Sequence, residues 1–566
     1  MVQGGAAAAG RVRAGAPALT WAASLLALLA GAAHAASIAW PLASRIHPDP
    51  IPSLAAGQPA AWLQWLSMLC LAALLGRAAS AGQALRRGWL FATAMLAATF
   101  WWLFISMHLY GGMAAPLAAA AVLALAAALG LYYGLAGGLW WWLARRTGWG
   151  AWGQALLFAA LWTLAEWARG TWFTGFPWGA SGYAHLDSLA WLAPYSGVYG
   201  MGALSAGLAM GAVAWARGGR IGRLGMTSAL LAWLALLVVP AAPGWVGAVL
   251  PEHTQPAGQT QVRLLQGNIP QDEKFEERSG LPLALQWYAE QVQQAAREAP
   301  ASGDRVLVVA PETAIPLLPQ VLDADYWRSL LAANNGSHAA VLVGLPLGSW
   351  EAGYTNSVLG WRPGEGVPEP APGAALYRYD KHHLVPFGEF IPWGFRWFTE
   401  LMNIPLGDFA RGPLGQPAFD WDGQRFAPNI CYEDLFGEEL AVAFNDQAQA
   451  PTVLVNVSNI AWFGNTVAID QHRHISRLRA LELGRPMLRA TNTGSTAIIS
   501  HRGEVVQELP RLTRGVLAGT VEGRQGTTPF ARWAGRWGLW PVVGLCAAVV
   551  LLAGLSAFLR PARWRP

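Results

Sequence analysis

The chain has 566 residues, of which 54% are hydrophobic and only 13% are charged. This balance departs from soluble proteins towards chains that lipid solvates, so it excludes a wholly soluble protein and predicts a membrane protein. The net charge of +5 does not require a nucleic-acid partner, because membrane topology accounts for the arginines described below.

Apolar blocks of about 20 residues, the length of a membrane-spanning helix, fill the first half of the chain. They predict seven spans, at 18–38, 58–76, 88–107, 115–143, 151–168, 189–215 and 225–249. An eighth apolar block lies near 538–559. We therefore predict a membrane domain at 1–250, a soluble domain at 255–530, and a C-terminal membrane helix with a short cytoplasmic tail at 535–566.

Arginines divide unevenly between the two alternating sets of loops and termini, thirteen against two. The larger set comprises Arg11, Arg13, Arg77, Arg86, Arg87, Arg145, Arg146, Arg217, Arg220, Arg223, Arg560, Arg563 and Arg565, and the smaller set comprises Arg45 and Arg169. Because positive loops stay in the cytoplasm, we expect both termini there and the soluble domain on the outer side of the membrane. Splitting 115–143 into two helices would destroy this asymmetry, so we predict one.

Two features of the spans remain open. The first span could instead be a cleaved signal peptide, since Arg11 and Arg13 precede it and Ala33–His34–Ala35 resembles a cleavage site. Glu166 and Arg169 lie near the outer end of a span, where charges are costly. They are interpreted either as a structural pair on one helix face or as a contact with substrate head groups.

Between residues 255 and 530, short β-branched runs alternate with helical stretches, which is typical of an α/β domain. Strands are expected at 262–265, 306–309, 340–343, 375–379, 425–430, 452–457, 487–490 and 497–500. Two polar helices, at 285–297 and 468–483, are suited to covering a sheet. The sequence has no phosphate-binding glycine loop, and we expect no cofactor.

Three of these strands end in a reactive side chain: Glu312, Lys381 and Cys431. Neighbouring strand ends are where α/β enzymes gather a site. A thiol, a carboxylate and an ammonium group together predict covalent acyl chemistry.

Each of the three also has a less specific interpretation. Cys431 could be a buried small apolar residue, but Cys70 and Cys546 fall in predicted spans and leave it no disulfide partner, and its polar neighbours favour a nucleophile. Lys381 could form a surface salt bridge, yet it is one of only two lysines among 38 basic residues, and a compact ammonium suits an oxyanion. Glu312 could simply begin a helix.

The residues around these three positions resemble the nitrilase superfamily, and the whole chain resembles the apolipoprotein N-acyltransferase family. The resemblance rests on Pro311–Pro316, Tyr379–Glu389 and Asn429–Asp434, with weaker matches at Gly267–Gln271, Asn456–Asn459, Trp462–Phe463 and Phe173–Trp178. It implies a multi-span α-helical membrane domain joined to an α/β domain built as an α-β-β-α sandwich. One departure is Phe275, where this family often carries Trp.

The resemblance also implies a mechanism. Glu312 takes the proton of the Cys431 thiol, the sulfur attacks a phospholipid ester, and Lys381 stabilises the oxyanion. A diacylated lipoprotein then accepts the acyl chain on its N-terminal amine, which makes the enzyme a ping-pong acyltransferase acting in the last step of lipoprotein maturation. Glu389 is expected to orient Lys381.

Further site residues are predicted on the same grounds. Tyr432 and Glu433 are expected to support the site, although no role for Glu433 follows from the sequence. Phe275 and Asn456 are expected to contact substrate. No metal is expected, because His382–His383 has no other ligands at metal-like spacing.

The segment Trp393–Phe398 and the apolar residues after it are too apolar for a solvated loop. Trp397 and Phe398 are therefore predicted to belong to a lid that dips into the bilayer surface and contacts lipid. The alternative is a loop packed on the sheet.

Two other functions compete with the acyltransferase. A membrane-tethered amidase would use the same three residues with water as the acceptor, but the membrane-half motif at 173–178 and the apolar loop favour a lipid substrate. A transporter with an accessory domain is disfavoured by the scarcity of ionisable residues at mid-span. The expected partners are phospholipid, diacylated lipoprotein and the surrounding lipid, and the expected state is a monomer.

Overall fold

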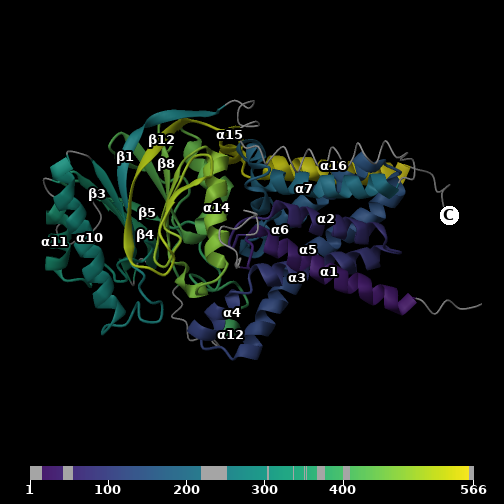
Figure 1. The fold of residues 1–566 in the computed structure, drawn as a ribbon, viewed down its shortest axis with the longest axis horizontal. Coiled ribbons are helices and arrows are strands. Elements are labelled where there is room, and N and C mark those ends of the chain that lie inside the picture. Colours follow the sequence, from purple (N-terminus) through teal and green to yellow (C-terminus); the bar gives the residue numbers. More distant parts are fainter. Residues whose placement is uncertain are drawn as a thin grey trace, which may run out of the picture.

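The computed structural model describes residues 16–42, 55–217, 252–302, 305–334, 337–349, 351, 353–365, 376–399 and 408–559. A bundle of helices and a two-sheet domain lie end to end along the long axis of the molecule (Figure 1). The predicted seventh span, 225–249, lies outside the described residues.

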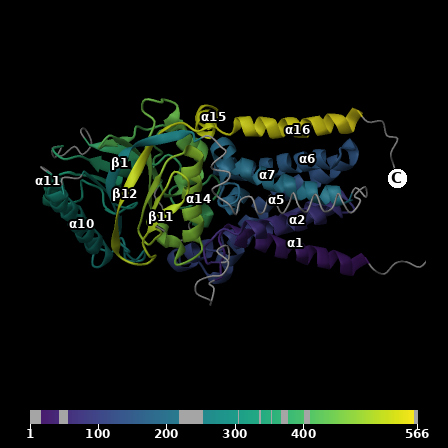
Figure 2. The ribbon, with the colours of Figure 1, turned by 45° about the horizontal axis from the view of Figure 1, so that its top comes forward.

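Helices occupy the other six predicted spans of the first half and the C-terminal one. They are α1 (Ala16–Ile38), α2 (Ala61–Gly76), α3 (Ala81–Thr99), α5 (Ala115–Thr147), α6 (Ala151–Thr171), α7 (Ala193–Arg217) and α16 (Trp540–Leu559). Within the described part of the chain, four helices are long and apolar enough to cross a membrane, and a bent pair makes up to five. The bundle runs away from the sheets, with α16 along its side (Figure 2).

The prediction of one long helix at 115–143 is confirmed by α5, which has 33 residues. The predicted span at 88–107 is present as a bent pair of helices. After α3 the chain bends by 61° into α4 (Leu103–Ile105) and the π-helical η2 (Ser106–Tyr110). The physical reason is tertiary: at the break, Trp102 is buried and its indole N–H donates to Gln471 of the two-sheet domain.

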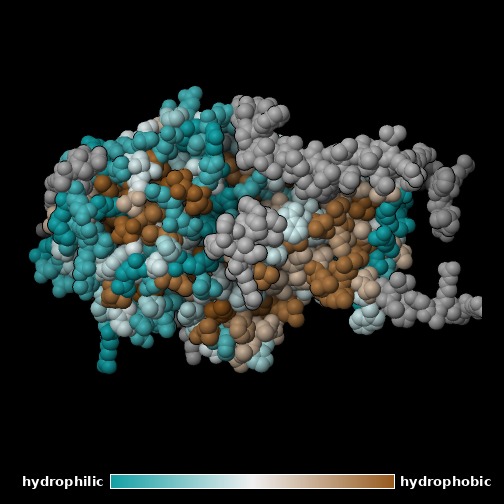
Figure 3. Space-filling view, in the orientation of Figure 1, coloured by the Kyte–Doolittle hydropathy of each residue, from teal (hydrophilic) through white to brown (hydrophobic). Residues whose placement is uncertain are grey.

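Arginines of the helical half gather at the end of the bundle that faces away from the sheets. Arg217 donates to the Gly76 carbonyl, and Arg145 donates to the Ala78 carbonyl at 3.3 Å, which joins the ends of α7, α2 and α5. The surface of the bundle is mainly apolar, with hydrophilic atoms at its far end (Figure 3). An apolar belt bounded by charge is what a bilayer solvates.

Two six-stranded mixed sheets form the other half, in the orders β12-β1-β2-β3-β4-β5 and β11-β10-β9-β8-β7-β6. The strands are β1 (Thr254–Gln266), β2 (Val306–Val309), β3 (Ala339–Ser349), β4 (Gly353–Trp361), β5 (Tyr377–Asp380), β6 (Phe419–Trp421), β7 (Gln424–Ile430), β8 (Val453–Ser458), β9 (Met487–Thr491), β10 (Ala497–Ile499), β11 (Val505–Glu508) and β12 (Gly515–Gly526). All eight predicted strands are present, together with four that the sequence pattern did not reveal.

The sheets stack face to face because both faces of their strands are apolar. In β2, Leu307 and Val309 enter the core between the sheets, whereas Val306 and Val308 pack under α10 (Gly280–Ser302) and α11 (Ala324–Asn334). On the outer face of the second sheet lie α14 (Ala468–Leu483) and α15 (Pro529–Trp537). The fold is therefore an α-β-β-α sandwich, as predicted.

Shorter helical turns complete the domain. These are α12 (Arg396–Thr399), α13 (Gly437–Leu440), η7 (Cys431–Leu435), η8 (Ala441–Phe444) and η9 (Ile460–Phe463), while η3 (Trp172–Thr174), η4 (Ser181–His185) and η5 (Ala190–Leu192) belong to the helical half. Of these, η7 begins at Cys431, so the predicted nucleophile lies where a strand turns directly into a helix.

Candidate active site

Glu312 follows β2 and the buried Ala310–Pro311 step. Its Oε1 accepts hydrogen bonds from Asn356 Nδ2 at 2.8 Å and from Lys381 Nζ at 3.3 Å, and its Oε2 accepts one from the Asn459 backbone N–H at 2.8 Å. Three donors with only 8% of the residue exposed describe an ionised carboxylate that is held in one orientation.

Lys381 follows β5, and only 1% of it is exposed. Its ammonium lies 3.3 Å from Glu312 Oε1 and 2.9 Å from Glu389 Oε1. Asn356 Nδ2 joins the same two carboxylates, at 2.8 and 2.7 Å. A buried ammonium between two carboxylates is paired on both sides, so it is fixed in place rather than mobile.

Cys431 directly follows β7 and is half-buried against the core between the sheets. Its φ is +50°, in the left-handed region that residues with a side chain rarely adopt. Its carbonyl oxygen is 3.3 Å from Asn456 Nδ2 and 3.2 Å from His472 Nε2. The strained turn is therefore held from two sides.

Glu312 and Lys381 come from the first sheet and Cys431 comes from the second. From the sequence we expected neighbouring strand ends, but the three residues come from two different sheets that face each other. The two sides are joined at β8 and the residue after it, because Asn456 donates to the Cys431 carbonyl oxygen and the Asn459 N–H donates to Glu312 Oε2.

The charges of the site follow from burial and from the neighbouring charged groups. Burial, together with the Glu312 carboxylate and against the opposing effect of Lys381, raises the pKa of the Cys431 thiol to about 12. Burial also acts to raise the pKa of Glu312, but Lys381, Asn356 and the Asn459 N–H outweigh it and leave that pKa below its usual value. Burial acts to lower the pKa of Lys381, but Glu389 and Glu312 outweigh it and raise that pKa. The resting site thus holds a neutral thiol, a carboxylate and an ammonium.

Glu433 connects the strand ends that carry Lys381 and Cys431. Its Oε1 accepts from the His382 N–H at 2.6 Å, and its Oε2 accepts from the Ile430 N–H at 2.7 Å and the Tyr379 hydroxyl at 2.9 Å. The contacts reach the residue after Lys381 and the residue before Cys431. Glu433 therefore joins β5 to β7, a role that the sequence alone did not reveal.

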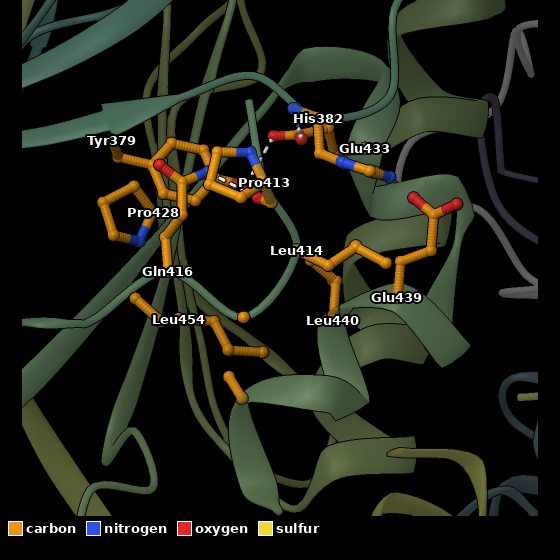
Figure 4. Close-up of a pocket in the computed structure, with 13 residues that line it drawn as sticks. Tyr379, His382, Pro413, Leu414, Gln416, Pro428, Glu433, Glu439, Leu440 and Leu454 are labelled. Atoms are coloured by element: carbon orange, nitrogen blue, oxygen red, sulfur yellow. Dashed lines mark hydrogen bonds between the residues drawn. The ribbon is translucent and has the colours of Figure 1, made fainter. Parts of the chain in front are cut away.

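A small pocket has Glu433 in its lining (Figure 4). Its lining includes Tyr379, Pro413, Pro428 and Leu454, and none of Glu312, Lys381 or Cys431. Since the reactive groups do not face it, this pocket is not where the chemistry would occur.

Tyr432, predicted to support the site, and Asn456, predicted to contact substrate, make different contacts. Tyr432 is buried and its hydroxyl donates to the Gly175 carbonyl of the helical half at 3.0 Å. Asn456 is fully buried beneath the Cys431 turn, where it also donates to Asn429 Oδ1 at 2.7 Å. Its contact is thus with the nucleophile's backbone, and a contact with substrate stays a prediction.

Two of the aromatic residues predicted to contact lipid are exposed: Phe275 is 53% exposed and Trp397 is 61% exposed. Phe398 belongs to the short helix α12. The Phe395 ring lies 5.4 Å from the Phe387 ring, and Phe387 packs in one cluster with Phe104 and Met107 of the helical half. The segment that carries Phe395 and Trp397 therefore adjoins the helical half.

Glu166 and Arg169 form no salt bridge with each other, although both belong to the described part of α6. Arg169 instead donates to the carbonyls of Phe176 at 2.5 Å and Trp178 at 2.7 Å, and Glu166 Oε1 accepts from the Ser181 hydroxyl at 2.7 Å. Both are buried, so in this structure they brace the turn at 173–178 rather than contacting a surface ligand.

Three further residues of the site were not found by sequence reasoning. Asn356 lies in β4 and belongs to no motif, whereas Asn459 ends the matched stretch Asn456–Asn459 but contributes only its backbone N–H. Lys274, the second lysine, is buried, and its Nζ lies 3.3 Å from the Glu312 carbonyl. Its rarity was a usable signal, because the two lysines of the chain flank the same glutamate.

Comparison with known proteins identifies both halves of the chain. Residues 52–211 match the family model described as the apolipoprotein N-acyltransferase N-terminal domain. Residues 261–529 match the model described as carbon-nitrogen hydrolase, which agrees with the two-sheet fold.

Curated relatives are similar over nearly the full length. A protein of Verminephrobacter eiseniae named apolipoprotein N-acyltransferase is 54% identical over 528 residues, covering 91% of this chain and 92% of that protein. Proteins of the same name from Ralstonia nicotianae and Bordetella bronchiseptica are 46% and 42% identical, covering 88% and 93% of this chain and 89% and 95% of theirs.

Proposed function

This chain belongs to the apolipoprotein N-acyltransferase family, and we propose that it moves an acyl chain from a phospholipid to the N-terminal amine of a diacylglyceryl-cysteine lipoprotein through a thioester on Cys431. The observation that carries the proposal is the ion pair between the buried Lys381 ammonium and the Glu312 carboxylate, at 3.3 Å. Both groups affect the pKa of the Cys431 thiol.

In the first half-reaction, Glu312 removes the Cys431 proton as the sulfur attacks the ester carbonyl. With a thiol pKa of about 12 and a carboxylate pKa below its usual value, free thiolate is scarce, so proton transfer accompanies attack. Lys381 stabilises the oxyanion. The carbon–oxygen bond then breaks, the leaving alkoxide takes the proton from Glu312, and a lysophospholipid departs.

In the second half-reaction, the α-amine of the lipoprotein attacks the thioester carbonyl. A carbon–nitrogen bond forms and the carbon–sulfur bond breaks, while Glu312 passes the amine proton to the sulfur. The products are an N-acylated lipoprotein and the free thiol, which closes a ping-pong cycle.

The same proposal places the sandwich, residues 255–530, in the periplasm and the membrane domain, 1–250, and C-terminal helix, 535–566, in the inner membrane. The support is the position of Arg145 and Arg217 at the end of the bundle remote from the sheets, because arginine-rich ends stay in the cytoplasm. The donor and the lipoprotein anchor would then reach Cys431 from the outer leaflet. We propose a monomer.

Lipid would reach the site past the exposed aromatic segment at 393–397. Trp393 is almost fully exposed, and the Phe395 ring lies 5.4 Å from the Phe387 ring that packs on the helical half. An exposed aromatic loop at this junction is suited to the bilayer surface. Replacing Trp397 and Phe398 with Ser should lower turnover of long-chain phospholipid while folding holds; undisturbed turnover would exclude the lid.

The transfer itself is tested with a phospholipid carrying a labelled acyl chain and a synthetic diacylated lipopeptide. We expect labelled triacylated peptide and lysophospholipid in equal amounts, and a loss of at least about 1,000-fold in Cys431→Ala. Release of free fatty acid with no labelled peptide would favour the amidase-like use of water. Solute flux that survives Cys431→Ala would favour a transporter.

A further inference from the structure

Gln471 of α14 makes three buried hydrogen bonds from the sandwich to the helical half. Its Oε1 accepts hydrogen bonds from the indole N–H of Trp102 at 3.0 Å and of Trp178 at 2.8 Å. Its Nε2 donates to the Thr99 carbonyl at 3.0 Å. Only 2% of the residue is exposed, so these bonds form in a dry interface, where the loss of one partner leaves the others unsatisfied.

The next residue, His472, touches the nucleophile's backbone. Its Nδ1 lies 3.2 Å from Arg489 Nη2, and because a guanidinium can only donate, Nδ1 accepts and Nε2 carries the hydrogen. That Nε2 is 3.2 Å from the Cys431 carbonyl oxygen and 3.0 Å from Asp434 Oδ1. His472 therefore donates to the turn in which Cys431 adopts its φ of +50°.

The helical half reaches the same turn by two other contacts. The Trp178 ring stacks on the His472 ring, with centroids 5.5 Å apart and planes 27° apart. Tyr432, adjacent to the nucleophile, donates to the Gly175 carbonyl at 3.0 Å. Arg169 holds the turn that presents both groups, through the carbonyls of Phe176 and Trp178.

We propose that Gln471 is a positioning residue, which locks α14 to the helical half and thereby holds His472 against the Cys431 carbonyl. A strained turn persists only where its surroundings over-determine it, and here part of those surroundings is supplied by the membrane half. That half is thus a component of the acylation site as well as an anchor. This inference rests on the proposed function, because it assigns a determinant of the rate of thioester formation.

The test compares Gln471→Met with Arg477→Gln in the full-length protein. Met keeps the length of Gln and removes all three bonds. Arg477 is a matched control: it lies on the same helix and also crosses to the helical half, donating to Asp187 at 2.7 Å, but Asp187 is largely exposed. The measurement is the single-turnover rate of thioester formation over a range of phospholipid concentrations, together with the melting temperature.

We expect the maximal acylation rate of Gln471→Met to fall by about 10- to 100-fold, the effect of a misplacement near 1 Å, with a half-saturating lipid concentration unchanged within twofold. Arg477→Gln should acylate like the wild type. Equal acylation rates in the two variants would overturn the inference, as would a fall in Gln471→Met confined to the half-saturating concentration.

Trp178→Phe supplies a second variant if Gln471→Met folds poorly. Phe keeps a ring over His472 and removes one donor to Gln471, so we expect a smaller fall in rate than in Gln471→Met. In the double variant, the fold-reductions in acylation rate of the two single variants should not multiply, because both substitutions remove the bond between Trp178 and Gln471. Fold-reductions that multiply would contradict the inference. A wild type that forms no thioester would instead overturn the proposed function.

Discussion

At the scale of single residues, the site depends on opposing charges that are buried together. Glu312 stays ionised because Lys381 and three hydrogen bonds offset its loss of water, while the thiol beside it stays protonated. A base below its usual pKa and an acid above it cannot exchange a proton at rest. The proton therefore moves only when a substrate carbonyl arrives to receive the sulfur.

Lys274 should set the acid limit of the reaction. Its ammonium acts on Glu312 and helps to lower that carboxyl's pKa. Removing the positive charge destabilises the carboxylate, raises its pKa, and protonates the base at a higher pH. We expect Lys274→Met to move the acidic limb of the pH profile for thioester formation upward.

The ionisable groups that interact with the Glu312 carboxylate are Lys381, Lys274 and the Cys431 thiol. Glu389 also pairs with the ammonium of Lys381. Lys274→Arg keeps the charge and serves as the control, so its acidic limb should stay near that of the wild type. An acidic limb that is the same in Lys274→Met and Lys274→Arg would contradict this role for Lys274.

At the scale of elements, helix α15 is fixed to the sandwich by the residue that precedes it. Thr528 is the N-cap of α15: its hydroxyl accepts from the Ala531 N–H at 3.1 Å and donates to the Glu482 carbonyl at 2.6 Å. Thr528→Ala removes both bonds and should lower the free energy of unfolding by about 1–2 kcal/mol, measured as a lower melting temperature in detergent.

Thr528→Ser keeps the hydroxyl and should stay close to the wild type in melting temperature. Neither variant should change the rate of thioester formation under conditions where the protein is folded, since Thr528 contacts no residue of the site. A Ser variant as destabilised as the Ala variant would show that the cap is not responsible.

Elements with a clear period could be predicted from the sequence, and the others could not. The run Val306–Val309 that precedes Glu312 could be predicted as a strand because it is continuously apolar and mostly β-branched. Strand β4, which carries Asn356, was missed because its Tyr354–Ser357 stretch is polar although largely buried. The bend after α3 was missed because Phe100–Leu103 continues an apolar span, and only the distant Gln471 explains the break.

The same distinction separates the parts of the site. Glu312, Lys381 and Cys431 could be found because strand ends and residue rarity mark them. Asn459 contributes a backbone N–H, and His472 reaches Cys431 across 41 positions of the chain; such contacts depend on how the two sheets and the bundle meet. A sequence pattern fixes neighbours along the chain, not partners across an interface.

At the scale of the whole molecule, the bundle and the two-sheet domain lie end to end (Figure 1). Arg145 and Arg217 lie at the end of the bundle remote from the sheets, and Tyr432, next to the reactive Cys431, contacts Gly175 of the helical half. Orientation is tested with single cysteines in a chain whose three native cysteines are replaced. Glu290→Cys on α10 and Arg146→Cys at the end of α5 are both at exposed positions.

We expect an impermeant thiol reagent to label Glu290→Cys in intact spheroplasts, and to label Arg146→Cys only after the membrane is opened. The physical reason is that the arginine-rich end stays in the cytoplasm. The reverse labelling pattern would place the sandwich on the cytoplasmic side and contradict the proposed route of the lipid.

The most direct measurement of the central claim is intact-protein mass spectrometry after incubation with phospholipid alone. The account predicts a mass increase of one acyl chain on the wild type, lost on addition of a diacylated lipopeptide and absent from Cys431→Ser. No adduct on the wild type under conditions of turnover, or an adduct that persists in Cys431→Ser, would contradict it.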